Sequence, residues 1–455
     1  MHSRRISTMV RLFSWSHRIK RLGQGGLLLA ALLSVHPVLA AATTSDQVLE
    51  WIAIMNNAAL AGGTTPLATT RVAALVSSSV FDSVNGIDPR YQPLYVKPAA
   101  KRDSSRRAAA VQAAYVMLVH VYPAQAASLT AQRNASIAAL SSKESATAIQ
   151  DGITWGQTVA DSIWAWRLTD GIAPPPPPFE GVLGIVGSTA AIGIWRPTPL
   201  ANGQPGLSGA GPQFASMTPW VLTRPSQFRL EPPPALTSAT YTTDYDEAKI
   251  MGVYTGSQRT ADQSELALFW AGNTPLYWNR IASQIASEHT RSLLDNAHLF
   301  ALLNVAMADA GIACWDSKYR YVYWRPITAI RSGDLDDNAN TDVDTAFVPW
   351  LDFFPAGTPA HPEYPSGHST ASGAAAFVLA STFGDDTSFT VTSEVRPGTR
   401  SFPSFSAATA EIADARVFGG IHWRNSCVRG NALGVAVATY VLGHAMLSGD
   451  NQDQQ

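Results

Sequence analysis

Pro365-Ser366-Gly367-His368-Ser369 stands directly before a run of small residues, Thr370–Ala380, that is typical of a helix. Proline restricts φ where the chain enters this segment, and glycine lets the backbone approach a ligand closely. The free N–H groups of a helix N-terminus carry a partial positive charge and can hold an anion. The serine hydroxyl and the glycine N–H would add donors, and the histidine could exchange a proton. A plain turn with a helix cap and an incidental histidine is the alternative interpretation.

The composition favours a large buried core. The 455 residues are 46% hydrophobic and 15% charged, whereas about 25% charged is usual for a globular protein. The length predicts two or three domains, or one large domain. The formal net charge of −2 argues against a nucleic-acid partner, because a phosphate backbone requires clustered Lys and Arg. Cys314 and Cys427 are too few for a disulfide-rich scaffold or a cysteine-built metal cluster, and they could either pair or remain buried thiols.

Residues 1–42 are typical of an export signal. A basic front precedes a short apolar stretch at Gly25–Leu33, and small residues at Val38–Ala42 offer cleavage sites. Arg4 and Arg5 could form a twin-arginine signal, and a buried N-terminal helix is the alternative. We expect export to the periplasm or the extracellular space.

No later run reaches the ~20 apolar residues that a membrane span requires. The nearest candidates, at 299–315 and 432–447, contain Asp309 and His444 respectively. The mature chain is therefore expected to have no membrane span.

The hydrophobic pattern is helical over most of the chain. Apolar residues recur at three- and four-residue steps across 45–166 and again across 244–315. The last two helices are expected at about Ser406–Phe418 and Asn425–Met446. Strand-like alternation is hard to find, so we predict an all-α helical bundle with long irregular loops.

Two long loops interrupt the helices. Five prolines at Pro174–Pro178 end the first helical region, because no helix continues through them. The Gly-, Pro- and Ser-rich chain that follows contains aromatic residues, which favour an ordered excursion packed against the helices. A second break covers Gly333–Pro365. We predict five parts: an export signal (1–42), an N-terminal helical region (43–173), the loop excursion (174–240), a catalytic helical bundle (241–446) and a polar tail (447–455).

Lys318 and Arg325-Pro326 form a second candidate segment. An extended chain of seven residues would span ~23 Å, too far for both cationic heads to reach one small anion. On helical turns the separation falls to ~10 Å and both side chains leave nearly the same face. We expect such helical turns, with Pro326 ending the segment. A solvated basic pair at a helix end is the alternative.

Arg416 and His422 form the third segment. On an unbroken helix they would lie on different faces, but Gly419 and Gly420 allow a bend that turns His422 back toward Arg416. A buried histidine with a satisfied ring is the alternative. Taken together, the three segments supply three cations, a Ser-Gly cradle and two histidines, which suits a multivalent tetrahedral oxyanion.

The order of these segments resembles the signature shared by vanadium-dependent haloperoxidases and acid phosphatases of the phosphatidic-acid-phosphatase type. Lys318 to Pro326 and Pro365 to His368 match the first two blocks in full. In the third block Arg416 and His422 are present, but Ala415 replaces the usual serine and Ser426 replaces the usual aspartate. The missing acid leaves the orientation of His422 without an expected partner.

The resemblance implies roles for these residues. Five would hold the equatorial oxygens of vanadate or phosphate: Lys318, Arg325, Ser366, Gly367 and Arg416. His422 would be the axial ligand of vanadium, and His368 the acid–base residue on the opposite side. Lys318 would polarise the bound peroxide, so it counts as catalytic together with the two histidines. In a phosphatase, His422 would instead attack phosphorus and His368 would protonate the leaving alcohol.

Two further residues match positions of the family's halide pocket. His361 stands where bromoperoxidases carry a histidine, whereas Trp315 matches an aromatic residue of chloroperoxidases. Ordinary packing near the site would explain both equally well. In the segment Phe269–Asn273, relatives tend to place an acidic residue that this chain lacks.

The resemblance implies an all-α, secreted, vanadate-dependent haloperoxidase. Its partners would be hydrogen peroxide, a halide (bromide or iodide in preference to chloride) and a small organic acceptor, and a homo-oligomer is compatible with the sequence. One alternative is a secreted acid phosphatase that forms a phosphohistidine. Another is a catalytically inactive helical protein that binds phosphate.

Overall fold

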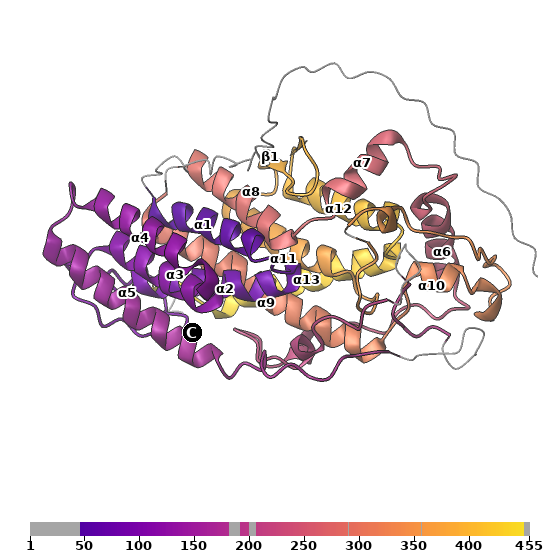
Figure 1. Ribbon diagram of the computed structural model, residues 1–455, viewed down its shortest axis with the longest axis horizontal. Coiled ribbons are helices and arrows are strands. Elements are labelled where there is room, and N and C mark those ends of the chain that lie inside the picture. The colour runs from indigo at the N-terminus through magenta and orange to yellow at the C-terminus, as the bar shows by residue number, and fades with distance from the viewer. Residues whose placement is uncertain (1–45, 182–191, 200–205, 290, 356, 450–455) are drawn as a thin grey trace, which may run out of the picture. The chain divides into compact units, whose positions relative to one another are not determined.

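The computed structural model describes residues 46–181, 192–199, 206–289, 291–355 and 357–449. The predicted export signal, most of the polar tail and parts of the loop excursion lie outside these residues. Within them the protein has thirteen α-helices and a single two-stranded sheet (Figure 1). The predicted all-α class is therefore confirmed.

The N-terminal helices occupy the region where the apolar pattern predicted them. They are α1 (Gln47–Ala61), α2 (Pro66–Asn85), α3 (Arg106–Val121), α4 (Ala126–Leu140) and α5 (Ala146–Arg167), with a short 3-10 turn at Pro123–Gln125. Their starts carry the expected caps, because Ser105 and Ser145 accept backbone N–H groups at the beginnings of α3 and α5. Pro66 occupies the first position of α2, where its missing N–H costs nothing.

The loop excursion is ordered where the structure describes it. Two 3-10 turns, Pro212–Ala215 and Pro225–Phe228, interrupt it, and Phe214 and Trp220 are buried in the main core. The fully buried Asp309 carboxylate accepts the backbone N–H groups of Trp220, Val221 and Leu222 at 2.7, 2.8 and 2.9 Å. The acid that interrupts the apolar run at 299–315 therefore fastens the excursion to the helix that carries it.

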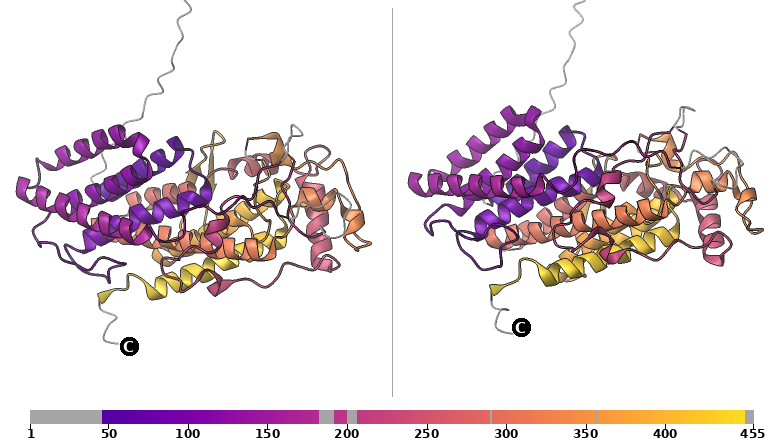
Figure 2. Two further views of the ribbon diagram at one scale, coloured as in Figure 1. Left: turned by 60° about the horizontal axis from the view of Figure 1, so that its bottom comes forward. Right: turned by 90° about the horizontal axis from the view of Figure 1, so that it is seen from below.

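The remaining helices follow the excursion, and α9 is the longest of them. They are α6 (Ala239–Gly252), α7 (Ala261–Phe269), α8 (Thr274–Glu288), α9 (Leu293–Tyr321), α10 (Pro326–Ile330), α11 (Gly367–Phe383), α12 (Phe405–Phe418) and α13 (Arg424–His444). Helices α2, α11 and α13 all pack along α9 (Figure 2). N-terminal and C-terminal helices share one hydrophobic core, and the proposed division of the chain at 173, 240 and 446 stays a prediction.

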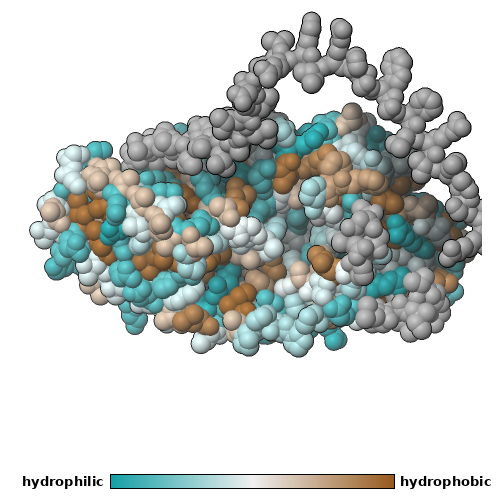
Figure 3. All heavy atoms as spheres, viewed as in Figure 1, coloured by the Kyte–Doolittle hydropathy of each residue, from teal (hydrophilic) through white to brown (hydrophobic). Residues whose placement is uncertain are grey.

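Helix α9 passes the length and composition test for a membrane span, alone among the helices of the described ranges. However, 94% of its most apolar window is buried inside the protein, as in the core helix of a bundle. On the face drawn in Figure 3, hydrophobic and hydrophilic residues are interspersed.

A hairpin was not predicted. Strand β1 (Phe389–Thr392) pairs antiparallel with β2 (Thr399–Phe402), with Phe389 opposite Phe402. Phe389 and Val391 are buried and alternate with exposed threonines, which is the two-residue period of a half-buried strand. Strands of four residues are too short for such alternation to stand out in the sequence.

Candidate active site

Lys318 and Arg325 lie on two different helices. Lys318 is in the last turn of α9, which ends at Tyr321, and Arg325 is the N-cap of α10. The chain turns between them at Val322, whose φ of 49° is left-handed. The prediction that Pro326 ends the segment is wrong, because Pro326 begins α10 at the position where proline suits a helix. The turn, rather than one continuous helix, brings the two cations together.

Both cations are fully buried and bonded to the segment before α11. Lys318 Nζ donates to the carbonyl oxygens of Pro362 and Glu363, each at 2.8 Å. Arg325 donates through Nε to the His361 carbonyl at 3.0 Å and through Nη1 to the Ile421 carbonyl at 2.8 Å. Arg325 therefore links the segment before α11 to the loop that carries His422.

Ser366, Gly367 and His368 form the start of α11, as the sequence predicted. Ser366 is the N-cap, and its hydroxyl accepts the Ser369 N–H at 3.4 Å and the Ser369 hydroxyl at 3.1 Å. A Cβ on Gly367 would lie 3.2 Å from the Trp315 ring and 4.0 Å from Lys318 Cε. Glycine thus keeps the backbone at the helix start close to the lysine and open to a ligand.

Arg416 and His422 flank the predicted bend. Arg416 lies in the last turn of α12, Gly420 adopts a φ of 75°, and His422 precedes α13. Arg416 is only 2% exposed, yet its single hydrogen bond within the described part of the chain joins Nη1 to the Trp270 carbonyl at 3.3 Å. Its Nε has no hydrogen-bond partner among the described residues. A buried guanidinium with unused donors is typical of an anion-binding site.

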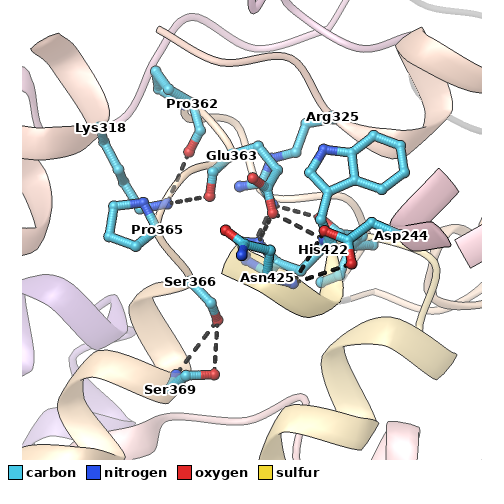
Figure 4. Close-up of polar contacts among 12 residues, drawn as sticks. Asp244, Lys318, Arg325, Pro362, Glu363, Pro365, Ser366, Ser369, His422 and Asn425 are labelled. Carbon is cyan, nitrogen blue, oxygen red and sulfur yellow. Dashed lines mark hydrogen bonds and ion pairs between the residues drawn. The ribbon is translucent and has the colours of Figure 1, made fainter. Parts of the chain in front are cut away.

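Glu363 supplies the acid that the sequence motif lacks. Its Oε1 lies 2.6 Å from His422 Nδ1 and accepts the Trp423 N–H at 3.0 Å (Figure 4). The hydroxyl of Ser426, which replaces the usual aspartate, is buried and has no hydrogen-bond partner among the described residues. A carboxylate on Nδ1 fixes the tautomer with the proton on Nδ1, so Nε2 is an acceptor and a possible ligand. His422 Nε2 lies 3.2 Å from Arg325 Nη1, so it faces the cations.

The sequence contained a signal for Glu363. It is an acid placed two residues before Pro365 in a flank that also carries His361, and it is fully buried. The motif directs attention to Ser426 instead, because the family's acid stands at that position of the chain. A search for any acid near the three blocks, without regard to motif position, would have found it.

Burial dominates the electrostatics of the site. It lowers the pKa of Lys318 to about 7 and raises the pKa of Glu363 to about 7. Burial also lowers the pKa values of Arg325 and Arg416 to about 10. The site therefore contains three cationic side chains and one carboxyl group, and binding of a multivalent anion would offset the desolvation cost of the cations.

The histidines are neutral in this environment. Burial lowers the pKa values of His361, His368 and His422 well below the ordinary value, and the neighbouring cations lower them further. For His368 the largest charge effect comes from Arg416, and for His422 it comes from Arg325. Both rings therefore lie within the field of the same cations.

The segment Phe269–Asn273, which lacks the family's acidic residue, contributes two backbone carbonyls to the site. The Trp270 carbonyl accepts from Arg416, and the Gly272 carbonyl lies 3.2 Å from His368 Nε2. The segment therefore reaches the site, but it presents neutral dipoles to the arginine where a carboxylate would present a full charge.

His361 and Trp315 lie side by side next to the cationic group. Their ring centroids are 4.9 Å apart, and Lys318 Nζ lies 5.5 Å from the Trp315 ring. His361 Nδ1 is 3.0 Å from Arg325 Nη2 and 3.1 Å from the Pro362 carbonyl. Both predicted halide-pocket residues are thus positioned at the site.

Six of the nine predicted site residues line one cavity of about 710 Å³. Its lining includes Trp315, His361, Gly367, His368, Arg416 and His422. The other three predicted residues, Lys318, Arg325 and Ser366, are fully buried behind this surface. The three distant segments of sequence therefore converge, and we call the surface made by these nine residues and Glu363 the floor of the cavity.

Cys314 and Cys427 are free, buried thiols. Cys314 Sγ lies 3.7 Å from the Pro365 carbonyl, directly behind the start of α11. Of the two possibilities left open by the sequence, the structure has the unpaired one.

Comparisons with known proteins agree with this geometry. Residues 298–449 match the model of the second helical-bundle domain of vanadium chloroperoxidase. The chain is 29% identical over 194 residues to vanadium chloroperoxidase of Curvularia inaequalis, a match that covers 36% of this chain and only 31% of that protein. This match therefore does not show that the chain has the activity of the whole relative.

Solved structures cover more of the chain. A bacterial vanadium-dependent iodoperoxidase aligns with a TM-score of 0.74 and 25% identity, over 89% of this chain and 98% of that one. The apo form of a bacterial vanadium-dependent chloroperoxidase aligns at 0.64 with 18% identity, over 82% and 92% of the two chains, and shows the shared fold. These matches support the resemblance to the superfamily of vanadium-dependent haloperoxidases and type 2 phosphatidic acid phosphatases.

Proposed function

We propose that this protein is a vanadate-dependent haloperoxidase that oxidises halide with hydrogen peroxide. The observation that carries the proposal is the floor itself, which contains three buried cations and one carboxyl group and where Arg416 retains unused donors. The likeness to an iodoperoxidase over nearly its whole length supports it.

The residues of the floor fit vanadate. Arg416 Nε lacks a partner, Gly367 leaves space that a Cβ would fill, and His422 turns a nitrogen lone pair toward the cations. The oxygens would be held by Lys318, Arg325, Ser366, Gly367 and Arg416, and the metal by His422 Nε2. Bound vanadate would supply a Lewis-acid centre that activates peroxide toward halide without a change of oxidation state.

The chain's own residues would orient ligands and move protons. Glu363 holds the His422 ring through Nδ1, so that Nε2 keeps one direction. Lys318 would donate a hydrogen bond to peroxide and draw negative charge toward itself. His368, whose pKa is lowered in the free site by burial and by Arg416, would become a proton carrier once an anion offsets the arginine charge.

The proposal includes a preference for iodide or bromide over chloride. His361 supports it, because a neutral imidazole lies against Trp315 at the edge of the floor. We also propose that the protein is exported and acts without a membrane span or a nucleic acid, on peroxide, halide and a small organic acceptor. Sedimentation measures whether the protein forms a homo-oligomer.

A pair of assays tests the function. Purified protein is dialysed against orthovanadate without phosphate and assayed for peroxide-dependent oxidation of iodide, bromide and chloride. Hydrolysis of a phosphate ester by the vanadate-free protein is measured in parallel. His422→Ala is the test variant, and His444→Ala, an exposed histidine at the end of α13, is the matched control.

We expect iodide and bromide oxidation by wild type and His444→Ala, and none by His422→Ala. Ester hydrolysis without halide oxidation would identify the alternative, an acid phosphatase, because phosphate and vanadate share charge and shape. Silence in both assays with retained phosphate binding would identify an inactive phosphate-binding protein. Either result overturns the proposal.

A further inference from the structure

We propose that the cavity holds a neutral, largely apolar organic acceptor, and that this molecule is halogenated while it is bound there. The inference rests on the proposed function, since it specifies where the oxidised halogen goes. It differs from that function in its site, because the residues that would bind the acceptor are not those that would bind vanadate.

The cavity extends well beyond the floor. Most of its other lining residues come from the α1–α2 connection (residues 59–70), the excursion at 210–214, the segment 271–275 and the hairpin loop at 394–395. We call these four segments the wall. The volume of about 710 Å³ lies within the usual range of roughly 300–1,000 Å³ for small-molecule sites. Peroxide and a halide ion need far less room.

The wall is apolar. Its large side chains are Leu60, Leu67, Phe214 and Val395, and Ile172 lies beside them in the cavity lining. Glu394 is the one ionisable side chain of the wall, and its carboxylate already binds Arg280 at 2.6 Å and the Asn273 N–H. A charged acceptor would lose hydration here without gaining a partner, whereas an apolar one gains from burial.

The position of the cavity joins it to the chemistry. Trp315, His361, His368 and Arg416 line the same space as the wall, so oxidised halogen leaving the floor enters a volume that the acceptor would fill. An electron-rich carbon of the acceptor forms a bond to the halogen of hypohalous acid as the halogen–oxygen bond breaks. The oxygen leaves as hydroxide and takes up the proton lost by that carbon, which gives water.

The wall offers positions where volume can be added without touching the floor. Ala68 is half-buried on α2 and lines the cavity, so Ala68→Phe would fill part of it. Ala138→Phe, on an exposed position of α4, is the matched control. Leu67→Trp is a second filling variant, also half-buried, in case the first does not fold.

Two measurements follow. Equilibrium dialysis measures binding of 1,3,5-trimethoxybenzene, a neutral and electron-rich probe, to the vanadate-free proteins. Vanadate-loaded proteins are then assayed for bromination of the same compound and, separately, for triiodide formation without any organic acceptor. We expect saturable binding to wild type, with Ala68→Phe raising both Kd and KM at least tenfold while triiodide formation stays within twofold.

Each outcome decides a separate point. Absence of saturable binding to wild type, or equal binding by Ala68→Phe and wild type, overturns the acceptor site. A fall in triiodide formation that parallels the fall in bromination also overturns it, because the floor would then have been damaged. If wild type forms no triiodide, the proposed function fails and halogenation of a bound acceptor fails with it, whereas the dialysis still decides the binding site.

Discussion

The floor and the wall of the same cavity are built on different principles. The floor consists of buried charges whose partners lie on α9, α10, α11, α12 and the loop before α13, almost all within the residues that match the family model. Most of the wall lies outside the matched residues and consists of loop and helix-end residues with apolar side chains. From this difference we propose that the floor binds the oxyanion, whereas the wall determines which organic acceptor this chain binds. Variants that affect one surface and spare the other test this separation.

Replacing Arg416 by Met should have the largest effect on anion binding. Arg416 makes one long hydrogen bond to the protein and leaves Nε unpartnered, so most of its donors are available to a ligand. Losing charge-assisted hydrogen bonds in a dry site should weaken sulfate binding by about 100-fold. Isothermal titration of the vanadate-free protein with sulfate measures the change.

The same variant should not destabilise the ligand-free fold. Removing a buried, largely unpaired cation in favour of an apolar side chain is often neutral or stabilising. Arg325→Met is the contrast, because Arg325 bonds to the carbonyls of His361 and Ile421 and its loss leaves both unsatisfied. A lower melting temperature for Arg416→Met than for Arg325→Met would contradict the assignment of Arg416 to the ligand.

Replacing Glu363 by Ala should have the next largest effect. Without the carboxylate, His422 loses its partner at Nδ1 and its ring orientation, which typically costs 10- to 100-fold in ligand affinity. Glu363→Gln should recover most of the loss, because an amide oxygen can still accept from Nδ1–H. The measurement is vanadate affinity by ⁵¹V NMR, and equal losses in both variants would argue for a purely structural role.

Much of the floor could be predicted from the sequence, because its residues lie in short segments whose spacing is tied to local structure. Ser366 and Gly367 begin a helix, and Gly420 makes a bend, for reasons that act within a few residues. Glu363 could not be assigned in this way, because its partner His422 lies on a different segment and only the folded chain brings them together. The turn at Val322 was missed for a related reason, since a left-handed valine has no local signature.

The wall could not be predicted. Leu67 and Phe214 belong to patterns that are equally typical of core packing, and nothing in their spacing distinguishes a residue that lines a cavity from one that fills the core. The helices and the packed excursion were predictable from periodicity and aromatic content, whereas the cavity depends on which side chains are absent between them. Small residues such as Gly311 and Ala68 leave that space.

Anion binding to the floor should weaken as pH rises through 7. Lys318 and Glu363 both have pKa values of about 7 in the ligand-free site. Above that pH the lysine loses its positive charge and the glutamate gains a negative one, so both changes disfavour an anion. Deprotonation of each group should weaken anion binding by up to about tenfold per pH unit above its pKa.

Sulfate is the suitable probe, because its own charge is constant over this range. The control is Lys318→Arg, because arginine keeps its positive charge over this pH range. In this variant the slope of log Kd for sulfate against pH should be smaller by about one proton. A slope that is the same in wild type and Lys318→Arg would show that the lysine does not titrate. Affinity that is constant from pH 6 to 9 would contradict both pKa shifts.

The smallest effect on anion binding is expected from Leu67→Ala in the wall. Leu67 is half-buried and lines the cavity on α2, and its aliphatic side chain has no group that could hydrogen-bond to the floor. Truncation removes apolar surface from the wall, so affinity for 1,3,5-trimethoxybenzene should fall severalfold while sulfate affinity stays within twofold. A change in sulfate affinity as large as that of Glu363→Ala would mean that wall and floor are mechanically coupled. In that case the binding of the oxyanion and the binding of the organic acceptor could not be assigned to separate surfaces.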